Sequence, residues 1–380
     1  MKRWPKIPLG EVATCLDSQR IPLKDDDRQK RLGSVPYYGA NGQVGWIDKA
    51  IFDEPLLLVA EDGGHFDEPE RGVAYTIRGP AWVNNHAHVL RMDESKVLLD
   101  FLGYHFRHFD FRPYITGTTR AKLTQRDLMR VSVPVPSLAE QERVVKLLDE
   151  ADELRKLRAQ AHRRTADLLP ALFHEMFGDP ILNPRKWPKG TLGLACQKLT
   201  DGTHSSPPST DEGVPYITAK HLREYGLDFD RDPTYISPEN HREIYARCDP
   251  KPGDVLYIKD GVTTGLAAVN RYDYQFSMLS SLALMRPDAA KCDSEFLCAW
   301  LNDKAVKASM LGQMAGAAIR RLTLTKLRKA AILLPPLPLQ KEFAKRVTEI
   351  RELETKQATS RDRLDALFQS MLHRAFRGEL

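Results

Sequence analysis

Two short basic segments offer the clearest chemistry in this sequence. GTTRAKLT at 117–124 and GAAIRRLT at 316–323 each combine glycine, small residues and positively charged side chains. Residues 107–130 hold six arginines and lysines against two aspartates, and residues 304–329 hold seven against none. Open backbone N–H groups beside basic side chains suit a phosphate strand, and Thr or Arg side chains can reach base edges. The pattern predicts two nucleic-acid-binding loops; the alternative is a solvated helix face beside a turn.

The predicted DNA contacts follow from loop position and side-chain chemistry. Those in the first half are Tyr38, Asn41, Gln43, Thr118, Thr119, Arg120 and Lys122. Those in the second half are Thr203, His204, Lys220, Lys259, Thr263, Thr264, Arg320 and Arg321.

No catalytic residue and no metal site is predicted. The chain lacks a GxxxxGK[ST] phosphate loop and a glycine-rich dinucleotide fingerprint. The acidic run EDGG at 61–64 lacks the further ligands of a cation site and is expected to be a turn at a strand end. His86 and His88 would share a strand face and could bind a metal with His105 and His108, but the second half has no equivalent cluster. We therefore expect structural histidines and no cofactor in this chain.

Length and composition limit the class of protein. A chain of 380 residues predicts two or three domains, and a net charge of +5 permits a polyanionic partner without requiring one. The start has no apolar stretch typical of a signal peptide, and the longest apolar runs are too short for a bilayer. We expect a cytoplasmic protein with reduced cysteines, because none of the five forms a CxxC pair: Cys15, Cys196, Cys248, Cys292 and Cys298.

The chain repeats itself with a period near 190–200 residues. WPK at 4–6 recurs at 187–189, and each copy is followed by Leu-Gly. Later residues match at a constant offset of 199: Gln141 with Gln340, His174 with His373, and Phe177 with Phe376. A tandem duplication of whole modules follows, because this period is too long for a solenoid repeat. Short β-branched and aromatic runs mixed with helical stretches predict an α+β fold for each module.

Each module ends in a long predicted helix. Ser137 and Glu140 have capping-box spacing, and Gly178 closes the first helix. Apolar residues recur at spacings of three and four in both helices, which favours a coiled coil over a plain surface helix. Pro170 should bend the first helix near residues 166–170. The residues predicted to pair the helices are Val144, Leu147, Ala151, Leu154, Arg158, Phe343, Ile350, Leu353 and Gln357.

The order module, helix, module, helix predicts a geometry. A helix of about 40 residues is about 60 Å long, and a second helix leaving the far module pairs most directly by running back antiparallel. Arg158 and Gln357 would then face one another and fix the register. Because about 60 Å corresponds to roughly 17 base pairs of B-DNA, the two modules would hold well-separated DNA segments.

With these motifs in this order, the chain resembles the specificity subunits of type I restriction–modification enzymes over essentially its whole length. The strings that carry the likeness are the WPK-x-x-LG opening of each half, YYGANGQVGWID at 37–48, DGTHSSPP at 201–208, KPGDVLYIKDG at 251–261, GAAIRRLT, PVPSLAEQERVVKLLDE, PPLPLQKEFAKRV and HRAFRGEL. The resemblance implies target recognition domains at 1–137 and 179–336, with spacer helices at 138–178 and 337–380.

The resemblance also implies a function. Each domain of such a protein reads one half of a bipartite double-stranded DNA target, and the helices set the gap between the halves. The helices also dock two methyltransferase subunits, which bind S-adenosylmethionine and methylate adenine, and motor-nuclease restriction subunits complete the complex. This chain itself would be a non-catalytic specificity subunit.

Two other classes of protein remain open from the sequence. A free-standing DNA-binding regulator would bind its site tightly without a methyltransferase. A coiled-coil scaffold with protein-binding end domains would show little salt-dependent affinity for DNA.

Overall fold

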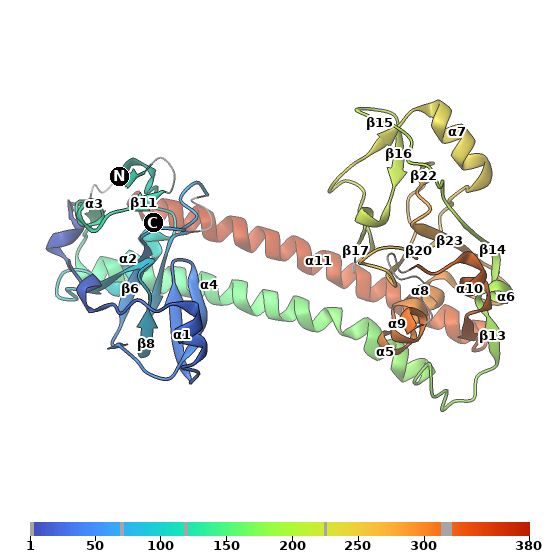
Figure 1. The fold of residues 1–380 in the computed structure, drawn as a ribbon, viewed down its shortest axis with the longest axis horizontal. Coiled ribbons are helices and arrows are strands. Elements are labelled where there is room, and N and C mark those ends of the chain that lie inside the picture. Colours follow the sequence, from blue (N-terminus) through green and yellow to red (C-terminus); the bar gives the residue numbers. More distant parts are fainter. Residues whose placement is uncertain (1–3, 69–71, 118–120, 224–225, 313–320) are drawn as a thin grey trace. The chain divides into compact units, whose positions relative to one another are not determined.

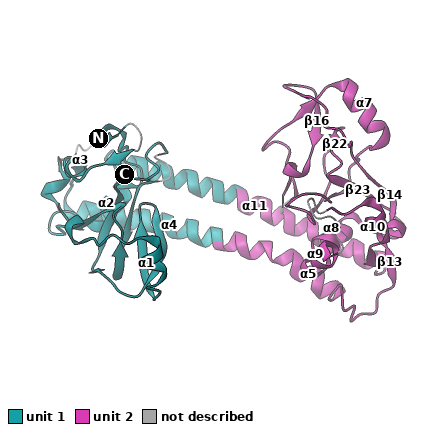
Figure 2. Cartoon of the chain, viewed as in Figure 1, with its two compact units in different colours: residues 1–159, 359–380 teal, residues 160–358 magenta. Residues whose placement is uncertain are grey.

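The computed structural model describes residues 4–68, 72–117, 121–223, 226–312 and 321–380. The chain divides into two compact units, with residues 1–159 and 359–380 in unit 1 and residues 160–358 in unit 2 (Figure 2). Both units mix helices and strands, which confirms the predicted α+β modules. None of the described helices has the length and apolar character needed to span a lipid bilayer.

Unit 1 contains two four-stranded sheets (Figure 1). The first is antiparallel, in the order β2 (Ala13–Cys15), β9 (Ala87–Met92), β6 (Leu56–Ala60), β7 (Ala74–Ile77). The second has the order β4 (Gly42–Ile47), β3 (Val35–Gly39), β8 (Pro80–Val83), β5 (Phe52–Asp53), with β3 and β8 parallel. All five residues of β6 are buried, since this strand is central and its faces pack on two separate clusters.

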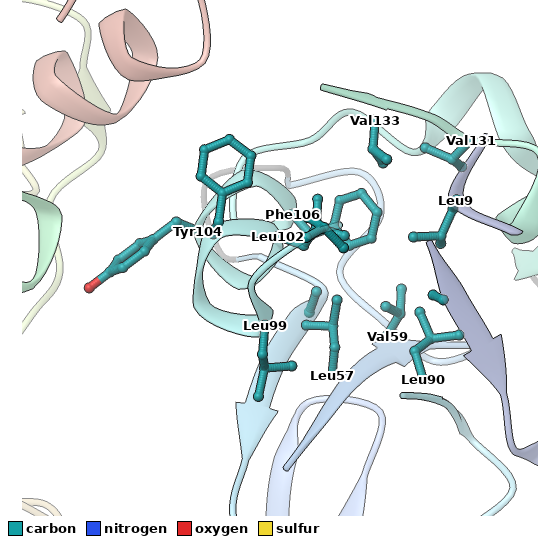
Figure 3. Close-up of a cluster of buried hydrophobic side chains, with 14 of the residues drawn as sticks. Leu9, Leu57, Val59, Leu90, Leu99, Leu102, Tyr104, Phe106, Val131 and Val133 are labelled. Carbon is teal, nitrogen blue, oxygen red and sulfur yellow. The ribbon is translucent and has the colours of Figure 1, made fainter. Parts of the chain in front are cut away.

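The helix α2 (Leu99–Phe106) supplies much of the core of unit 1. Leu57 and Val59 on one face of β6 pack with Leu102 and Phe106 of α2, as Figure 3 shows. Leu58 faces the opposite way and belongs to a second cluster between the two sheets. Burying each such side chain stabilises the fold by about 1.5–3 kcal/mol, so the alternation along β6 fixes which side of the sheet faces α2.

Unit 2 repeats this arrangement. Its first sheet has the order β14 (Cys196–Asp201), β23 (Leu282–Pro287), β20 (Val255–Ile258), β21 (Ala267–Val269). Its second has the order β15 (Ser209–Thr210), β19 (Tyr235–Ile236), β16 (Val214–Ile217), β22 (Ser277–Met278), and β16 and β22 are again parallel. The same central buried strand and the same parallel pair in both units confirm the predicted internal repeat.

In each module, a strand that precedes the two sheets in the chain pairs antiparallel with a strand that follows them, and this short pair closes the module. The pair is β1 (Lys6–Pro8) with β12 (Ser132–Pro134) in unit 1, and β13 (Lys189–Thr191) with β24 (Ala331–Leu333) in unit 2. The helices α3 (Gln125–Met129) and α10 (Leu324–Lys329) precede the closing strands at equivalent places. The helix α8 (Ser294–Asn302) of unit 2 corresponds to α2.

Shorter elements connect these parts. In unit 1 they are η1 (Leu9–Glu11), η2 (Asp17–Gln19), α1 (Asp25–Gln29), η4 (Arg112–Tyr114), β10 (Ile115–Thr116) and β11 (Lys122–Leu123). In unit 2 they are α6 (Leu192–Ala195), η5 (Ala219–His221), β17 (Leu222–Arg223), β18 (Gly226–Leu227), α7 (Pro238–Arg247) and α9 (Lys304–Gly312).

Both long helices are present, and the first is interrupted. α4 spans Leu138–Ala166, α5 spans Leu168–Phe177, and α11 runs without a break over Leu337–Ala375. The break at Asp167 confirms the bend predicted from Pro170, because proline has no N–H to donate to the carbonyl of Ala166. Gln369, the counterpart of Pro170 in α11, allows that helix to continue.

Within unit 1, the end of α11 packs on α4 and on the domain core. Arg155 donates to the carboxylate of Asp365 at 2.7 Å, and Arg143 donates to the backbone of Leu380 at 2.7 Å. Phe368 and Leu372 are buried in the same cluster as α2. The two segments therefore run in opposite directions in this unit.

The residues predicted to pair the helices need a correction. Val144, Ala151, Phe343 and Gln357 are buried, and Leu147, Arg158 and Ile350 are half-buried, but Leu154 and Leu353 are 55% and 41% exposed. Leu148 rather than Leu147 is buried on α4, because that turn of the helix packs on the sheet-and-helix core as well as on α11. The predicted contact of Arg158 with Gln357 would join the two units and stays a prediction.

Candidate nucleic-acid interface

In unit 1 the basic segment returns to the end of the central strand. The backbone N–H of Leu123 donates to the carbonyl of Glu61 at 2.8 Å, and Lys122 forms an isolated β-bridge with Asp62. Asn41, in the turn between β3 and β4, donates to the carbonyl of Gly63 at 3.0 Å. Three segments that are distant in sequence therefore meet beyond the carboxyl end of β6.

Unit 2 anchors its basic segment in the same way. The N–H of Leu322 donates to the carbonyl of Lys259 at 3.0 Å, and Arg321 forms an isolated β-bridge with Asp260. In both units a threonine then caps the helix that follows: the hydroxyl of Thr124 accepts from Asp127 N–H, and that of Thr323 accepts from Lys326 N–H. The two basic segments thus leave equivalent strands and enter equivalent helices.

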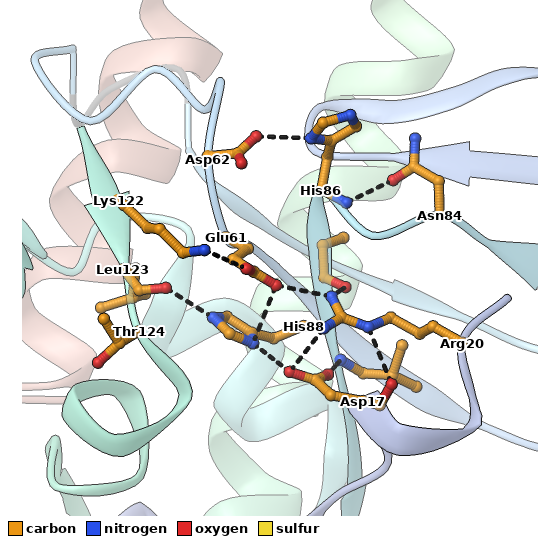
Figure 4. Close-up of polar contacts among 12 residues, drawn as sticks. Asp17, Arg20, Glu61, Asp62, Asn84, His86, His88, Lys122, Leu123 and Thr124 are labelled. Atoms are coloured by element: carbon orange, nitrogen blue, oxygen red, sulfur yellow. Dashed lines mark hydrogen bonds and ion pairs between the residues drawn. The ribbon is translucent and has the colours of Figure 1, made fainter. Parts of the chain in front are cut away.

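A buried network of charged side chains supports the segment in unit 1 (Figure 4). Arg20 contacts the carboxylates of Glu61 at 2.8 Å and Asp17 at 3.2 Å. Lys122 reaches the other oxygen of Glu61 at 2.9 Å, and its side chain remains 49% exposed. Lys122 is therefore tethered at the edge of the network while much of it faces solvent.

His88 links this network to the basic segment. Its Nδ1 lies 2.6 Å from the carboxylate of Asp17, and its Nε2 donates to the carbonyl of Leu123 at 2.8 Å. The residue is 1% exposed. His88 thus ties β9 to β11 and to the turn that holds Asp17.

The environment shifts the pKa values of the two carboxyl groups. Burial alone would raise the pKa of Asp17, but the hydrogen bond and charge of His88 hold it below its usual value. Burial would likewise raise the pKa of Glu61, and the hydrogen bonds from Lys122 and Arg20 lower it instead. Both groups are therefore carboxylates near neutral pH. Burial raises the pKa of the adjacent Cys15 thiol to about 12.

Unit 2 carries the opposite charge at the equivalent strand position. Lys259 takes the place of Glu61, and its ammonium lies 3.0 Å from Asp260 and 3.5 Å from Asp201. Arg247 also contacts Asp201, at 2.7 Å, and Arg321 lies 3.9 Å from Asp260. Charge pairing at this strand end is thus common to both units, although its residues differ.

Of the DNA contacts predicted in the first half, four are residues that the structure describes and three are not. Asn41 and Gln43 are exposed on the turn and on β4, and Tyr38 packs its ring 5.9 Å from that of Tyr75. Lys122 lies beside them through the bridge to Asp62. The remaining predictions lie outside the described residues: Thr118, Thr119 and Arg120.

In the second half, two predicted contacts need a correction. Lys259 and Thr264 are each only 5% exposed. The ammonium of Lys259 is drawn inward by Asp201 and Asp260, and the hydroxyl of Thr264 closes a turn by donating to Gly261. Neither side chain is placed to touch DNA directly.

The other predicted contacts of unit 2 are at the surface. His204, Lys220, Thr263 and Arg321 are exposed, and Thr203 is half-buried with its hydroxyl bonded to Ser205. Lys220 pairs with Asp232 at 3.0 Å. Arg320 lies outside the described residues.

Sequence reasoning missed the network beneath the loops. Asp17, Arg20 and Glu61 carry it in unit 1, and the available signal was the pairing of position 61 with position 259 in the duplication. His105 does not join His88. Its ring packs at a tilt against those of Phe106, Phe109 and Phe376, and burial lowers its pKa to about 3, so it is a neutral core residue.

Comparison with known proteins identifies the family. The model of the "Type I restriction modification DNA specificity domain" matches residues 1–162 and 184–361. A putative type I restriction enzyme specificity subunit from Haemophilus influenzae is 28% identical over 343 residues, which cover 88% of this chain and 84% of that protein.

Solved structures share the fold. The S subunit of a type I restriction–modification system from M. genitalium superposes with a TM-score of 0.59 at 15% identity, over 98% of this chain and 96% of that one. A chain from a structural study of type I R-M complex assembly gives a TM-score of 0.61 at 20% identity, over 100% of both chains.

The duplicated fold and its paired basic segments are therefore those of a DNA-specificity protein. The chain belongs to the type I restriction–modification DNA specificity family, and the resemblance predicted from the sequence is confirmed. Its function is recognition of a DNA target for such a system.

Proposed function

We propose that the chain reads a bipartite double-stranded DNA target, with one half read by each unit. The observation that carries this proposal is the repeated anchoring of a basic segment at a central strand end, through Leu123 to Glu61 and through Leu322 to Lys259. Two equivalent loops held by equivalent backbone hydrogen bonds suit two DNA segments of similar geometry. A protein scaffold would not explain why both copies have this basic edge, and membership of the specificity family does not favour a free-standing regulator.

The exposed polar side chains near the two strand ends divide by chemistry. Lys122 and Arg321 are suited to phosphates, and Arg321 can also pair with guanine in the major groove. The amides of Asn41 and Gln43 can read adenine, and Thr203, His204, Lys220 and Thr263 extend the surface of unit 2. Recognition domains at 1–137 and 179–336 contain all of these residues.

The helical segments 138–178 and 337–380 are proposed to pair as an antiparallel coiled coil that spaces the two half-sites. The opposite directions of α4 and α11 within unit 1 support this pairing. The 39 residues of α11 correspond to about 58 Å, or roughly 17 base pairs of B-DNA.

Catalysis is proposed to reside in partner subunits. Two methyltransferase subunits would dock on the helices and supply S-adenosylmethionine and adenine methylation, and restriction subunits would complete a cytoplasmic complex. The chain would hold no cofactor of that reaction and no catalytic residue. Its membership of the specificity family supports this division of labour.

Methylome sequencing tests the proposal. The chain would be expressed with its cognate methyltransferase in a methylation-free host, and the control would express the methyltransferase alone. We expect a bipartite adenine-methylated motif only when both are present. A soluble, co-purifying complex that methylates no such motif would contradict the proposal.

A further inference from the structure

The cluster beneath the first basic segment has a composition that its role as an ion-pair network does not require. Cys15, Asp17 and His88 each place one potential ligand atom within 4.8 Å of the others. Glu61 adds a carboxylate oxygen 3.9 Å from Nδ1 of His88. We propose that Cys15, Asp17, Glu61 and His88 form a structural zinc site.

The donor set and its spacing fit this ion. Zinc in proteins takes four ligands from thiolate, imidazole and carboxylate groups, at about 2.0–2.3 Å, so neighbouring ligand atoms lie roughly 3.3–3.8 Å apart. Nδ1 of His88 lies 2.6 Å from Asp17 and 3.9 Å from Glu61, on either side of that range. Cys15, Asp17 and His88 already lie within 4.8 Å of one another, and the Glu61 side chain has to move toward Cys15 to become the fourth donor. A site without an open position for substrate is typical of structural zinc.

The orientation of His88 is the second argument. Its Nε2 donates to the carbonyl of Leu123, which leaves Nδ1 directed at the carboxylates. Histidine ligands of metals commonly donate their other ring N–H to a backbone carbonyl in this way, because that bond fixes the tautomer and the ring plane. In the same cluster Arg20 contacts the two carboxylate oxygens that face His88 and donates to the carbonyl of Ala87, and so orients both carboxylates.

Unit 2 shows that the fold does not impose this composition. Asp201 lies at the equivalent strand end, but the residue that pairs with Tyr257 there is Ala283, in the place where His88 pairs with Val59 in unit 1. Among the described residues only the Cys15 cluster brings together three such ligands. The proposed zinc site therefore has no counterpart among the described residues of unit 2.

Zinc at this position would fix the first basic segment. His88 holds Leu123, and Glu61 holds both Lys122 and Leu123. This consequence rests on the proposed function, whereas the metal site does not.

Cobalt substitution tests the site in the full-length protein. After removal of metal by a chelator, Co²⁺ should give the visible bands of a tetrahedral complex together with near-ultraviolet thiolate-to-cobalt absorption, saturating at about one ion per chain. Zn²⁺ should displace Co²⁺ and abolish both the visible bands and the thiolate-to-cobalt absorption. C15S should lose the thiolate absorption and weaken zinc binding at least about tenfold, and H88N should weaken it similarly. C196S is the matched control, because Cys196 is a half-buried cysteine at the start of the equivalent strand β14, and it should behave as the parent protein.

A second measurement needs no substitution. Zn²⁺ should slow the alkylation of Cys15 by iodoacetamide at least about fivefold and leave that of Cys196 unchanged, as read by peptide mass spectrometry. Absence of stoichiometric cobalt absorption, its persistence in C15S, or equal alkylation of Cys15 with and without zinc would overturn the proposal. Because none of these readouts involves DNA, a failure of DNA recognition would leave the metal site intact, and the reverse also holds.

Discussion

A single glutamine fastens each module to the helix that follows it. The side-chain amide of Gln141 accepts from Leu98 N–H at 2.8 Å and donates to the carbonyls of Lys96 and Pro136, each at 2.9 Å. Gln340 makes the same three bonds, to Asp293 N–H and to the carbonyls of Lys291 and Pro335. Both glutamine side chains are fully buried, and each satisfies three backbone groups from two separate segments of the chain.

Replacing Gln141 by alanine should therefore destabilise unit 1. Three backbone groups would lose the hydrogen bonds that this buried side chain makes, and we expect a loss of about 2–4 kcal/mol in the free energy of unfolding. Urea unfolding followed by tryptophan fluorescence measures it. Gln369→Ala, an exposed position on α11, should change stability by less than about 0.5 kcal/mol. Equal effects of the two substitutions would contradict the assigned role.

At the residue scale, the sequence predicts which side chains are charged or polar better than it predicts where they lie in the fold. The match of Gln141 with Gln340 is visible in the sequence, but its partner Leu98 lies 43 residues away and is identified only by folding. Lys259 has the charge expected of a DNA contact, and only the structure reveals that Asp201 draws it inside. Arg321 and Asn41 are exposed, as turns and basic runs lead one to expect from local sequence, and their contact with DNA stays a prediction.

At the scale of elements, the first long helix presents an apolar surface that its own unit does not cover. Leu154 and Leu157 of α4 are 55% and 51% exposed. Exposed acidic residues lie on the same stretch of α4, among them Asp149 and Glu153. Exposed leucines within an acidic rim are typical of a protein-binding surface, which suits the methyltransferase docking proposed above.

Leu154→Glu combined with Leu157→Glu should separate docking from folding. Neither side chain belongs to a buried cluster, so circular dichroism and thermal unfolding should change little. Co-purification with the methyltransferase should fall at least about tenfold, because two charges would be buried at the interface without partners. Lys146→Glu, an exposed change elsewhere on α4, is the control. Retained co-purification in the double variant would place the docking surface elsewhere.

The long helices show which element-level signals are reliable. The interruption of the first helix follows from Pro170 alone, since a missing N–H acts within one turn. The buried face does not follow so simply. A heptad pattern assumes that one partner helix covers the seam, whereas α4 also packs on the domain core, and this shifts burial from Leu147 to Leu148.

At the scale of the molecule, the boundaries of each module coincide with a closing strand pair. In unit 2, β13 pairs with β24 through Lys189–Leu333, Gly190–Ile332 and Thr191–Ala331. Residues 179–336 therefore begin before this pair and end after it, so the segment carries its own closure. The duplication itself was predictable because equal offsets along the sequence need no knowledge of contacts.

Exchange of residues 179–336 with those of a relative should consequently change one half of the recognised motif and leave the other half and the spacing intact. The flanking Phe173, Phe177 and Phe343 stay in the recipient and must keep their packing on α8, so the donated segment needs aromatic residues at the positions of Phe296 and Trp300. Methylome sequencing of the hybrid reads the result. Changes in both halves would show that the two recognition functions are not separable.

The division of unit 1 into two stretches of chain has a consequence for synthesis. Phe368, Leu372 and Ala375 complete the core around α2, and Trp4 packs against Phe376 with ring centroids 6.4 Å apart. Unit 2, residues 160–358, is made between these stretches. At about 5–20 residues per second, a ribosome needs roughly 10–40 s for those residues. Unit 2 can thus fold as one continuous stretch, while the part of the protein made first waits, with an incomplete core, for the part made last.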